Sequence, residues 1–421
     1  MKQTKALPGH LPTLIASFLH FDLSFMLWVL LGALGIYIAE GAGLSAAEKG
    51  LMVAVPILSG SLLRVPIGLI SDRSGGKRVG ALMLAFLFLP LTIGWQSGSD
   101  LSELLAIGLM LGTAGASFAV ALPLASRWYP MERQGLVMGI AAAGNSGTVI
   151  ANLAAPRLAN IVGWHNVLAL AMLPLVLVLI AFILMAKDSP DRPQQVSLKS
   201  YLSIVKHKDM WWFCLFYSVT FGGYVGLSSF LPIFFRDQYK VDPVTAGYLT
   251  ALAAFVGSGI RPIGGYLADK FGGVRMLSMV LLGIGTVYTL ASTLPVLPLM
   301  VLLIIVGMAC LGMGNGSVFQ LVPQRFSAEI GIATGMVGAI GGLGGFMLPI
   351  LLGNIKQATG SFGPAFVVLA ICGFGMVVLL RALIALEQGW KLSWRVPKMM
   401  GHHEELLAEV TVDNQSLSAS R

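Results

Sequence analysis

Long apolar segments without a charged side chain constrain this 421-residue chain most strongly. The segments Ala169–Ala186 and Leu299–Leu311 are two of them. Such segments are typical of helices that cross a bilayer, and the alternating pattern of outer-membrane strands is absent. Charged residues make up only 11% of the chain, too few for the surface of a soluble domain of this size. The sequence therefore predicts an all-α membrane protein.

Hydropathy predicts twelve transmembrane helices, and the charge distribution gives their orientation. If the N-terminus is cytoplasmic, 20 of the 27 Lys and Arg residues lie near cytoplasmic ends, 5 near outer ends and 2 inside spans. The positive-inside rule thus places both termini in the cytoplasm and explains the net charge of +8 without a nucleic-acid partner. The predicted spans are 13–38, 51–71, 79–97, 103–126, 136–160, 164–186, 210–235, 245–268, 275–293, 297–322, 332–356 and 362–384.

One segment occurs twice. Residues 64–78 read RVPIGLISDRSGGKR and residues 261–275 read RPIGGYLADKFGGVR, at a constant offset of 197. A weaker echo at an offset of 196 pairs Gly135 and Gly139 with Gly331 and Gly335. Nearly equal offsets indicate duplication of a six-helix unit.

The duplication predicts four parts of the chain. These are a first six-helix half (1–187), a cytoplasmic linker (188–209), a second six-helix half (210–386) and a cytoplasmic tail (387–421). Residues 197–208 of the linker are predicted to form an amphipathic surface helix, and the tail is expected to be polar and partly disordered. Two halves related by an axis along the membrane normal indicate a secondary transporter with its site between them.

Each repeat ends in a short charged loop after a predicted span. The glycine turn presents an acid and two bases at the cytoplasmic face, where they can pair with neighbouring helices in one state and separate in another. Helix-end capping combined with positive-inside charge is the simpler alternative. Both loops resemble the signature loop of the major facilitator superfamily, which implies that fold and a gating role. The gating candidates are Asp72, Arg73 and Arg78 in the first loop and Asp269, Lys270 and Arg275 in the second.

Arg64 and Arg261 lie inside apolar spans, two helical turns before their signature Asp residues. An arginine at the centre of a membrane helix costs roughly 3 kcal/mol or more and cannot discharge by deprotonation. Of the 19 Asp and Glu residues, only Asp22 lies well within a predicted span, so internal counterions are missing. One cation from each half therefore predicts an anion site. The alternative is that each arginine caps carbonyl groups of a broken helix.

Two glycine-rich segments, 135–156 and 331–349, place small residues along one helix face. Such faces permit close packing of membrane helices. Packing does not explain Asn145, whose amide can donate to an anion oxygen or form a hydrogen bond with a neighbouring helix. No Walker loop, nucleophile elbow or metal-ligand cluster occurs, so the sequence indicates neither an enzyme nor a cofactor or metal site.

The segments AAAGNSG and GAIGGLGG, together with the paired arginines, resemble the nitrate/nitrite porter family. Further similarity lies in residues 20–34, 117–130, 216–232 and 314–323. The resemblance spans nearly all the predicted helices and looks closest to assimilatory bacterial members. It implies transport of nitrate and nitrite across the inner membrane by alternating access, and we expect a monomer. Gly341 stands where the first segment has Asn145, so only Asn145 is carried over.

In that family the anion is held between the arginines and flanked by aromatic rings. The resemblance implies that Phe118, Tyr217 and Phe221 are these rings, although aromatic residues at helical spacing usually belong to a core. Tyr217 and Phe221 are four residues apart and share a helix face. Planar guanidinium groups and flat rings suit nitrate, which is flat and weakly hydrated, better than sulfate or phosphate.

The coupling mode stays open, because the family includes both nitrate/nitrite exchange and proton symport. Symport requires a titratable group, for which Asp22 and His20 are the candidates. Asp22 can equally be a structural residue that pairs near the cytoplasmic loops. Two alternatives are transport of a small organic anion such as formate or oxalate, and a sensor or membrane enzyme that does not transport.

Overall fold

The computed structural model describes residues 9–129, 137, 140–141, 143–190, 203–326 and 330–395. Every regular element within these residues is helical. Eleven helical segments among them are long and apolar enough to cross a membrane, and three of these segments combine consecutive labelled elements: 101–126, 208–239 and 243–271. The predicted fifth span, 136–160, is described from residue 143 onward and contains α9, which gives the twelfth crossing of the predicted fold.

The first group of helices covers the N-terminal part of the chain. It consists of α1 (Leu11–Trp28), α2 (Leu30–Ala33), α3 (Gly35–Ala42), α4 (Ala46–Ser74), α5 (Gly76–Gln96), α6 (Leu101–Leu111), the 3₁₀ segment η1 (Gly112–Ser117), α7 (Phe118–Ser126), η2 (Ala143–Ser146), α9 (Gly147–Val162) and α10 (Trp164–Met185).

The second group covers the C-terminal part. It consists of α12 (Lys208–Tyr217), the π segment η3 (Ser218–Gly222), α13 (Gly223–Tyr239), α14 (Pro243–Gly259), α15 (Arg261–Phe271), α16 (Gly273–Ala291), α17 (Leu297–Arg325), α18 (Ile330–Thr359), α19 (Gly363–Leu386) and α20 (Gln388–Arg395).

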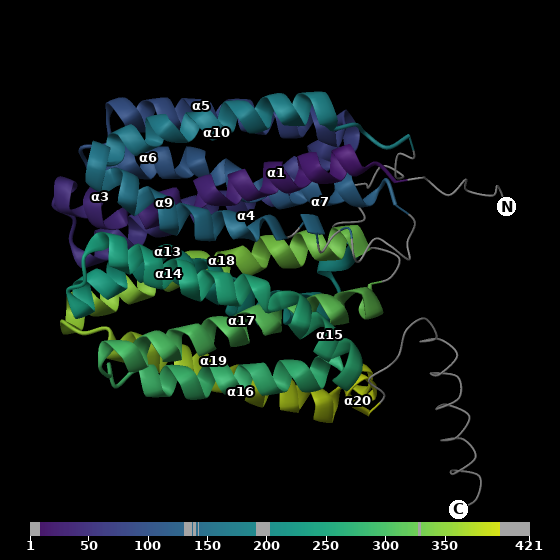
Figure 1. Ribbon diagram of the computed structural model, residues 1–421. Helices are drawn as coiled ribbons and strands as arrows, with labels where there is room; N and C mark the ends of the chain where they lie inside the picture. The colour runs from purple at the N-terminus through teal and green to yellow at the C-terminus, as the bar shows by residue number, and fades with distance from the viewer. Residues whose placement is uncertain are drawn as a thin grey trace, which may run out of the picture.

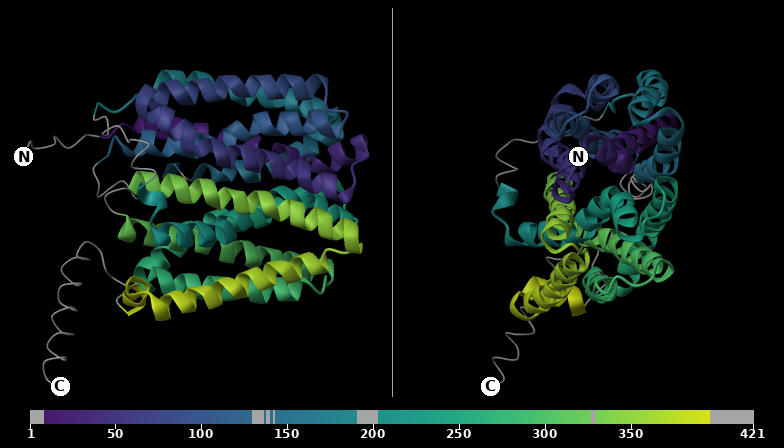
Figure 2. Two further views of the ribbon diagram at one scale, coloured as in Figure 1. Left: turned by 180° about the vertical axis from the view of Figure 1, so that it is seen from behind. Right: turned by 90° about the vertical axis from the view of Figure 1, so that its left-hand side faces the viewer.

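The two groups lie side by side, and the long helices of both groups are roughly aligned along one common axis (Figure 1). The first group forms the upper bundle, in purple to teal, and the second forms the lower bundle, in green to yellow. Seen along the helices, they form two clusters that meet along one face (Figure 2, right). The described N-terminal residues and α20 lie at the same end of the bundle, as an even number of crossings requires.

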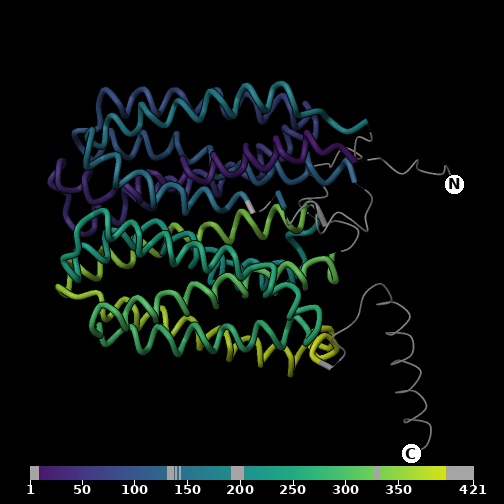
Figure 3. The backbone as a smooth tube through the Cα atoms, in the orientation of Figure 1, coloured from purple at the N-terminus to yellow at the C-terminus, as the bar shows by residue number. Residues whose placement is uncertain are grey.

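Several crossings depart from continuous α-helical winding along their path through the bundle, whose course the backbone tube follows (Figure 3). Residues 112–117 form a 3₁₀ segment between α6 and α7, and residues 218–222 form a π segment. A single residue, Ile260, separates α14 from α15. A π segment inside a helix frequently marks a functional site. Three groups that matter below lie at these interruptions: the carbonyl oxygen of Gly115, the Phe221 ring and the Arg261 side chain.

Helices α4 and α18 make the most extensive contact between the groups, and glycines allow it. A Cβ atom on Gly353 would lie 2.5 Å from the carbonyl oxygen of Ala46, and one on Gly50 would lie 2.4 Å from that of Pro349. The close approach of these two backbones therefore depends on the missing side chains.

The structure adds detail at the ends of two elements. Within the predicted tail, residues 388–395 form α20, whose Trp390 is buried and donates through Nε1 to Asp209 Oδ1 at 2.8 Å. Helix α4 contains the predicted span 51–71 and begins at Ala46, because Ser45 and Glu48 form a capping box. The predicted linker helix 197–208 lies largely outside the described residues.

We predict that Gly353→Ala lowers the unfolding temperature of the purified protein, because its methyl group would meet the backbone of α4. Overpacking of this kind costs about 1–3 kcal/mol, more than the helix propensity gained. Gly335→Ala is the matched control, since no atom of a described residue outside its own helix turn lies within 4 Å of the added Cβ atom. Thermal unfolding in detergent checks this prediction, and equal unfolding temperatures for the two variants would contradict it.

Candidate anion-binding site

Arg64 lies inside α4 with 3% of its surface exposed. Its Nε donates to the carbonyl oxygen of Gly115 in η1 at 3.0 Å, and its Nη1 donates to that of Gly338 in α18 at 2.5 Å. Its Nη2 is buried and has no hydrogen-bond partner among the described residues. Arg64 therefore does cap a carbonyl group of an interrupted helix, as the alternative interpretation proposed. Its Nη2 nevertheless remains available to a ligand.

Arg261 is the first residue of α15 and is half-buried. Its Nη2 donates to the hydroxyl oxygen of Tyr217 at 3.2 Å, and its guanidinium carbon lies 5.6 Å from the centre of the Phe319 ring. Arg261 therefore contacts two aromatic side chains of the second group, whereas Arg64 bonds backbone carbonyl groups from both groups.

Stacked rings connect the two arginines. Tyr217 and Phe221 lie 4.9 Å apart with an interplanar angle of 5°. The Phe221 ring faces the Arg64 guanidinium group at 5.0 Å, and the Tyr217 hydroxyl oxygen accepts from Arg261. The structure thus brings both predicted arginines to one aromatic wall, which spans the contact between the two groups.

Rings from the first group complete the surroundings. Phe118 and Trp28 each lie 5.5 Å from the Arg64 guanidinium carbon, and Phe118 stacks on Phe319 across the groups at 6.4 Å. We call this set the arginine–aromatic cluster: Arg64, Arg261, Trp28, Phe118, Tyr217, Phe221 and Phe319. Except for Trp28 and Phe319, the sequence predicted its members.

Trp28 and Phe319 were missed for different reasons. Phe319 lies 201 residues after Phe118, whereas the repeat has an offset of 197, so a comparison at the repeat offset does not pair the two rings. The difference of four residues is about one helical turn and keeps the ring on the same helix face. Trp28 is one aromatic residue within an apolar span, and it is oriented by a hydrogen bond from its Nε1 to the carbonyl oxygen of Pro56 at 2.7 Å. Only the folded chain reveals that contact.

Asn145 lies in η2 and is buried, and its Oδ1 has no hydrogen-bond partner among the described residues. None of the described hydrogen bonds joins it to either arginine. Its neighbours Gly144 and Gly147 pack against the backbone of α1, where an added Cβ on Gly147 would overlap the carbonyl oxygen of Asp22. The structure therefore places Asn145 in a tight helix contact and does not join it to the cluster.

The two candidates for proton coupling lie on α1. His20 is fully buried, with Nε2 at 3.2 Å from the carbonyl oxygen of Gly80. Asp22 accepts a hydrogen bond from the Ser146 hydroxyl at 2.5 Å, so its partner is η2 rather than a cytoplasmic loop. Among the described contacts, neither side chain touches Arg64 or Arg261.

The first signature loop forms the type of pair that the sequence predicted. Asp72 accepts from Arg127 Nη2 at 2.5 Å, and both residues belong to the first group. Arg127, at the end of α7, was not singled out from the sequence. Arg73 and Arg78 are exposed. The Gly75 turn instead approaches Asp188, whose Oδ1 accepts from the backbone N–H of Lys77 at the start of α5.

The second signature loop differs from the first. Asp269 and Lys270 are exposed, and Asp269 forms no ion pair within the described part of the chain. Arg275 instead donates through Nε to the carbonyl oxygen of Trp394 in α20 at 3.1 Å. The two loops therefore differ in their contacts, because α20 has no counterpart among the described residues of the first group.

Ion pairs join the two groups at the end of the bundle opposite the described N-terminal residues and α20. Lys49 Nζ lies 2.9 Å from Asp237 Oδ2, and Arg236 Nη2 lies 3.0 Å from Glu40 Oε1. The sequence placed both bases at outer ends but gave no sign of their partners, since the paired residues lie 188 and 196 positions apart.

Comparison with known proteins adds independent findings. A family model described as Major Facilitator Superfamily matches residues 16–349. A nitrite extrusion protein of Bacillus subtilis (strain 168) is 36% identical over 359 residues, covering 84% of this chain and 90% of that protein. A protein of Thermus thermophilus named probable nitrate/nitrite antiporter NarK1 is 34% identical over 395 residues, covering 85% and 87% of the two chains.

Solved structures share the fold. The nucleoside transporter NupG has a TM-score of 0.70 at 15% identity, covering 88% of this chain and 99% of its own. An inward-facing, occupied bacterial homolog of the human lysosomal transporter Spinster has a TM-score of 0.65 at 20% identity, covering 91% and 96%. At these identities the likeness concerns the fold alone.

We predict that Arg64→Lys and Arg261→Lys each weaken nitrate binding by about tenfold or more, because a lysine keeps the charge but loses the planar fork. Arg73→Lys, on the exposed first signature loop, is the conservative control and should bind like the wild type. Titration calorimetry of the purified protein measures all three. Wild-type affinity in either site variant would refute the geometry.

Proposed function

Because this chain belongs to the nitrate/nitrite porter family of the major facilitator superfamily, we propose that it carries nitrate and nitrite across the cytoplasmic membrane by alternating access, with both termini in the cytoplasm. The arginine–aromatic cluster is the observation that carries the proposal. It joins two permanent cations from different halves along one wall of rings, and no described carboxylate pairs with either. The names of the relatives from Bacillus subtilis and Thermus thermophilus agree with this substrate class.

The chemistry of the cluster suits a flat monovalent anion. The buried Nη2 of Arg64 is a donor without a described protein partner. Arg261 donates one hydrogen bond to the Tyr217 hydroxyl group through its Nη2. An anion oxygen that accepts from both arginines satisfies these donors and lies against the rings of Phe221 and Phe319. Sulfate and phosphate carry more charge and more tightly held water, and their tetrahedral shape does not match a flat wall.

The same charges explain why the empty carrier would close poorly. Two cations brought together in a medium of low dielectric constant repel each other, and a bound anion reduces that repulsion. The halves therefore rotate readily only with nitrate or nitrite between them. This favours exchange over proton symport, because Asp22 and His20 lie outside the cluster. Asn145 would then serve the packing of η2 against α1.

The ion pairs at the outer end form one of the two gates. Lys49 with Asp237 and Arg236 with Glu40 close the outer side in this conformation. The side chains are partly exposed, and such pairs are worth roughly 0–1 kcal/mol each, so the gate can open without a large barrier. The Asp72–Arg127 pair stays within the first half and stiffens its cytoplasmic end, while the second loop is held by α20.

Counterflow in proteoliposomes tests the function. We predict that ¹⁵N-nitrate enters vesicles loaded with nitrite about tenfold faster than empty vesicles, because the return step then carries an anion. Formate or oxalate inside the vesicles should leave the rate at that of empty vesicles, and an imposed pH gradient should not change the exchange. Stimulation by the carboxylates would support the small-organic-anion alternative, and binding without uptake would indicate a sensor.

The outer gate gives a separate prediction. Lys49→Gln combined with Arg236→Gln should raise the population with separated outer ends by a few-fold, because both pairs between the halves are lost. Spin labels at Ala42 and Ala358, in a background without Cys214, Cys310 and Cys372, report the separation as a distance distribution.

The matched control for that measurement is Arg157→Gln with Lys240→Gln. It removes the same charge from the same end, and these side chains are exposed without a described ion pair. An equal shift in the control would show that net charge, rather than the pairs, sets the equilibrium.

A further inference from the structure

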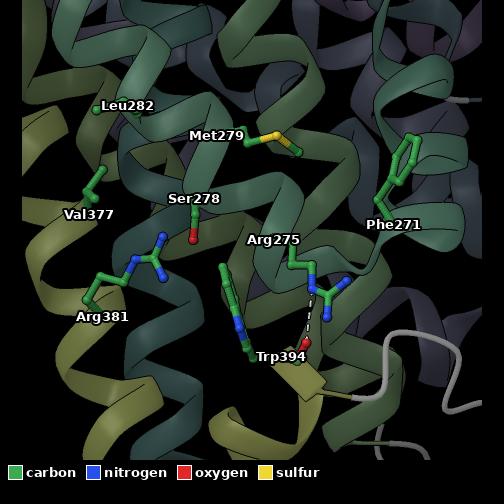
Figure 4. A pocket seen from close by; sticks show the side chains of 8 residues that line it. All are labelled: Phe271, Arg275, Ser278, Met279, Leu282, Val377, Arg381 and Trp394. Atoms are coloured by element: carbon green, nitrogen blue, oxygen red, sulfur yellow. Dashed lines mark hydrogen bonds between the residues drawn. The ribbon is translucent and has the colours of Figure 1, made fainter.

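A pocket of about 480 Å³ lies at the cytoplasmic end of the second group, away from the arginine–aromatic cluster. Its lining residues come from α15, α16, α19 and α20: Phe271, Arg275, Ser278, Met279, Leu282, Val377, Arg381 and Trp394. Figure 4 shows Arg275 and Arg381 on either side of the Trp394 indole, with Met279 and Leu282 farther from it. One end of the pocket is therefore cationic and the other apolar.

The apolar end opens toward the outside of the bundle. Met279 is 55% exposed and Leu282 is 51% exposed. On a membrane-spanning helix such side chains contact lipid rather than water. An occupant of the pocket is therefore in direct contact with the bilayer.

Both arginines of the pocket lie over the Trp394 ring and have no carboxylate partner among the described residues. Arg381 lies five residues before the end of α19, about 7 Å inside the helix, and its guanidinium carbon is 4.5 Å from the Trp394 ring. Neither Arg381 nor Arg275 forms an ion pair within the described residues. A cation facing the bilayer is stabilised when it reaches the lipid phosphate level, where long side chains extend.

From this geometry we propose that the pocket binds one anionic phospholipid of the inner leaflet. The phosphate lies at the edge of the Trp394 indole, where it accepts from Arg275 and Arg381, and an acyl chain runs along Met279, Leu282 and Val377. Basic pockets between membrane helices on the cytoplasmic side hold such head groups, and this leaflet is rich in anionic lipid. Charge and apolar surface meet in one pocket, which a soluble phosphate would use only in part.

The lipid would also act on the second signature loop. Arg275 belongs to that loop and donates to the carbonyl oxygen of Trp394, while Trp390 on the same helix α20 bonds Asp209 at the start of α12. A phosphate that bridges Arg275 and Arg381 therefore ties α16 and α19 to α20. This gives the second half an anchor where the first half has the Asp72–Arg127 pair.

Native mass spectrometry of the full chain, purified in detergent with equal amounts of phosphatidylglycerol and phosphatidylcholine, tests the proposal. The wild type should retain one phosphatidylglycerol with a preference of about tenfold. Arg275→Gln with Arg381→Gln should remove the preference, whereas Lys206→Gln with Lys208→Gln, an equal loss of exposed cytoplasmic charge, should keep it. Equal loss in both pairs would overturn the proposal.

A second variant separates a lipid from a soluble phosphate. Val377→Trp fills the apolar end without changing charge, and it should release the lipid; unchanged retention would contradict the proposal. Glycerol phosphate should fail to displace the lipid at equal concentration, and displacement would show that the site takes the free phosphate. If the wild type retains no phosphatidylglycerol but Glu404→Gln with Glu405→Gln gains it, the acidic tail is the occupant and the lipid assignment is wrong.

Discussion

The permanent charge of Arg64, buried between two groups of helices without a described carboxylate partner, is the constraint on which the site depends. A buried guanidinium cannot lose its proton at neutral pH, so its donors must be satisfied locally. The carbonyl groups of Gly115 and Gly338 satisfy two nitrogens, one from each group. The third nitrogen, Nη2, has no described partner and lies among aromatic rings. A small anion there would accept its hydrogen bond and neutralise the buried charge.

Interruptions of the helices place the site residues. Phe118 is the first residue of α7, Tyr217 the last of α12 and Arg261 the first of α15, and Phe221 lies within the π segment. At each interruption the backbone departs from regular α-helical winding, which changes the direction of the next side chains and frees carbonyl groups. The 3₁₀ segment at 112–117 is what offers the Gly115 carbonyl oxygen to Arg64.

The sequence could predict the features that depend on spacing and on uncompensated charge. The repeat at 197, the apolar spans and the isolated charges of Arg64 and Arg261 gave the twelve-helix fold and the pair of cations, and the family resemblance added Phe118, Tyr217 and Phe221. It could not predict contacts formed between distant segments, such as Lys49 with Asp237 or Arg127 with Asp72. The sequence did not predict α20, because Trp390 and Trp394 lie in a polar segment. Their contacts with Asp209 and Arg275 form only in the folded chain.

A structure determined with nitrate bound tests the central claim most directly. The account predicts a planar density within hydrogen-bond distance of Arg64 Nη2 and of the Arg261 guanidinium group, lying against Phe221 and Phe319. Omission of nitrate should remove that density and no other feature of the cluster. Density that contacts one arginine alone, or that lies away from both, would contradict a site shared by the two halves.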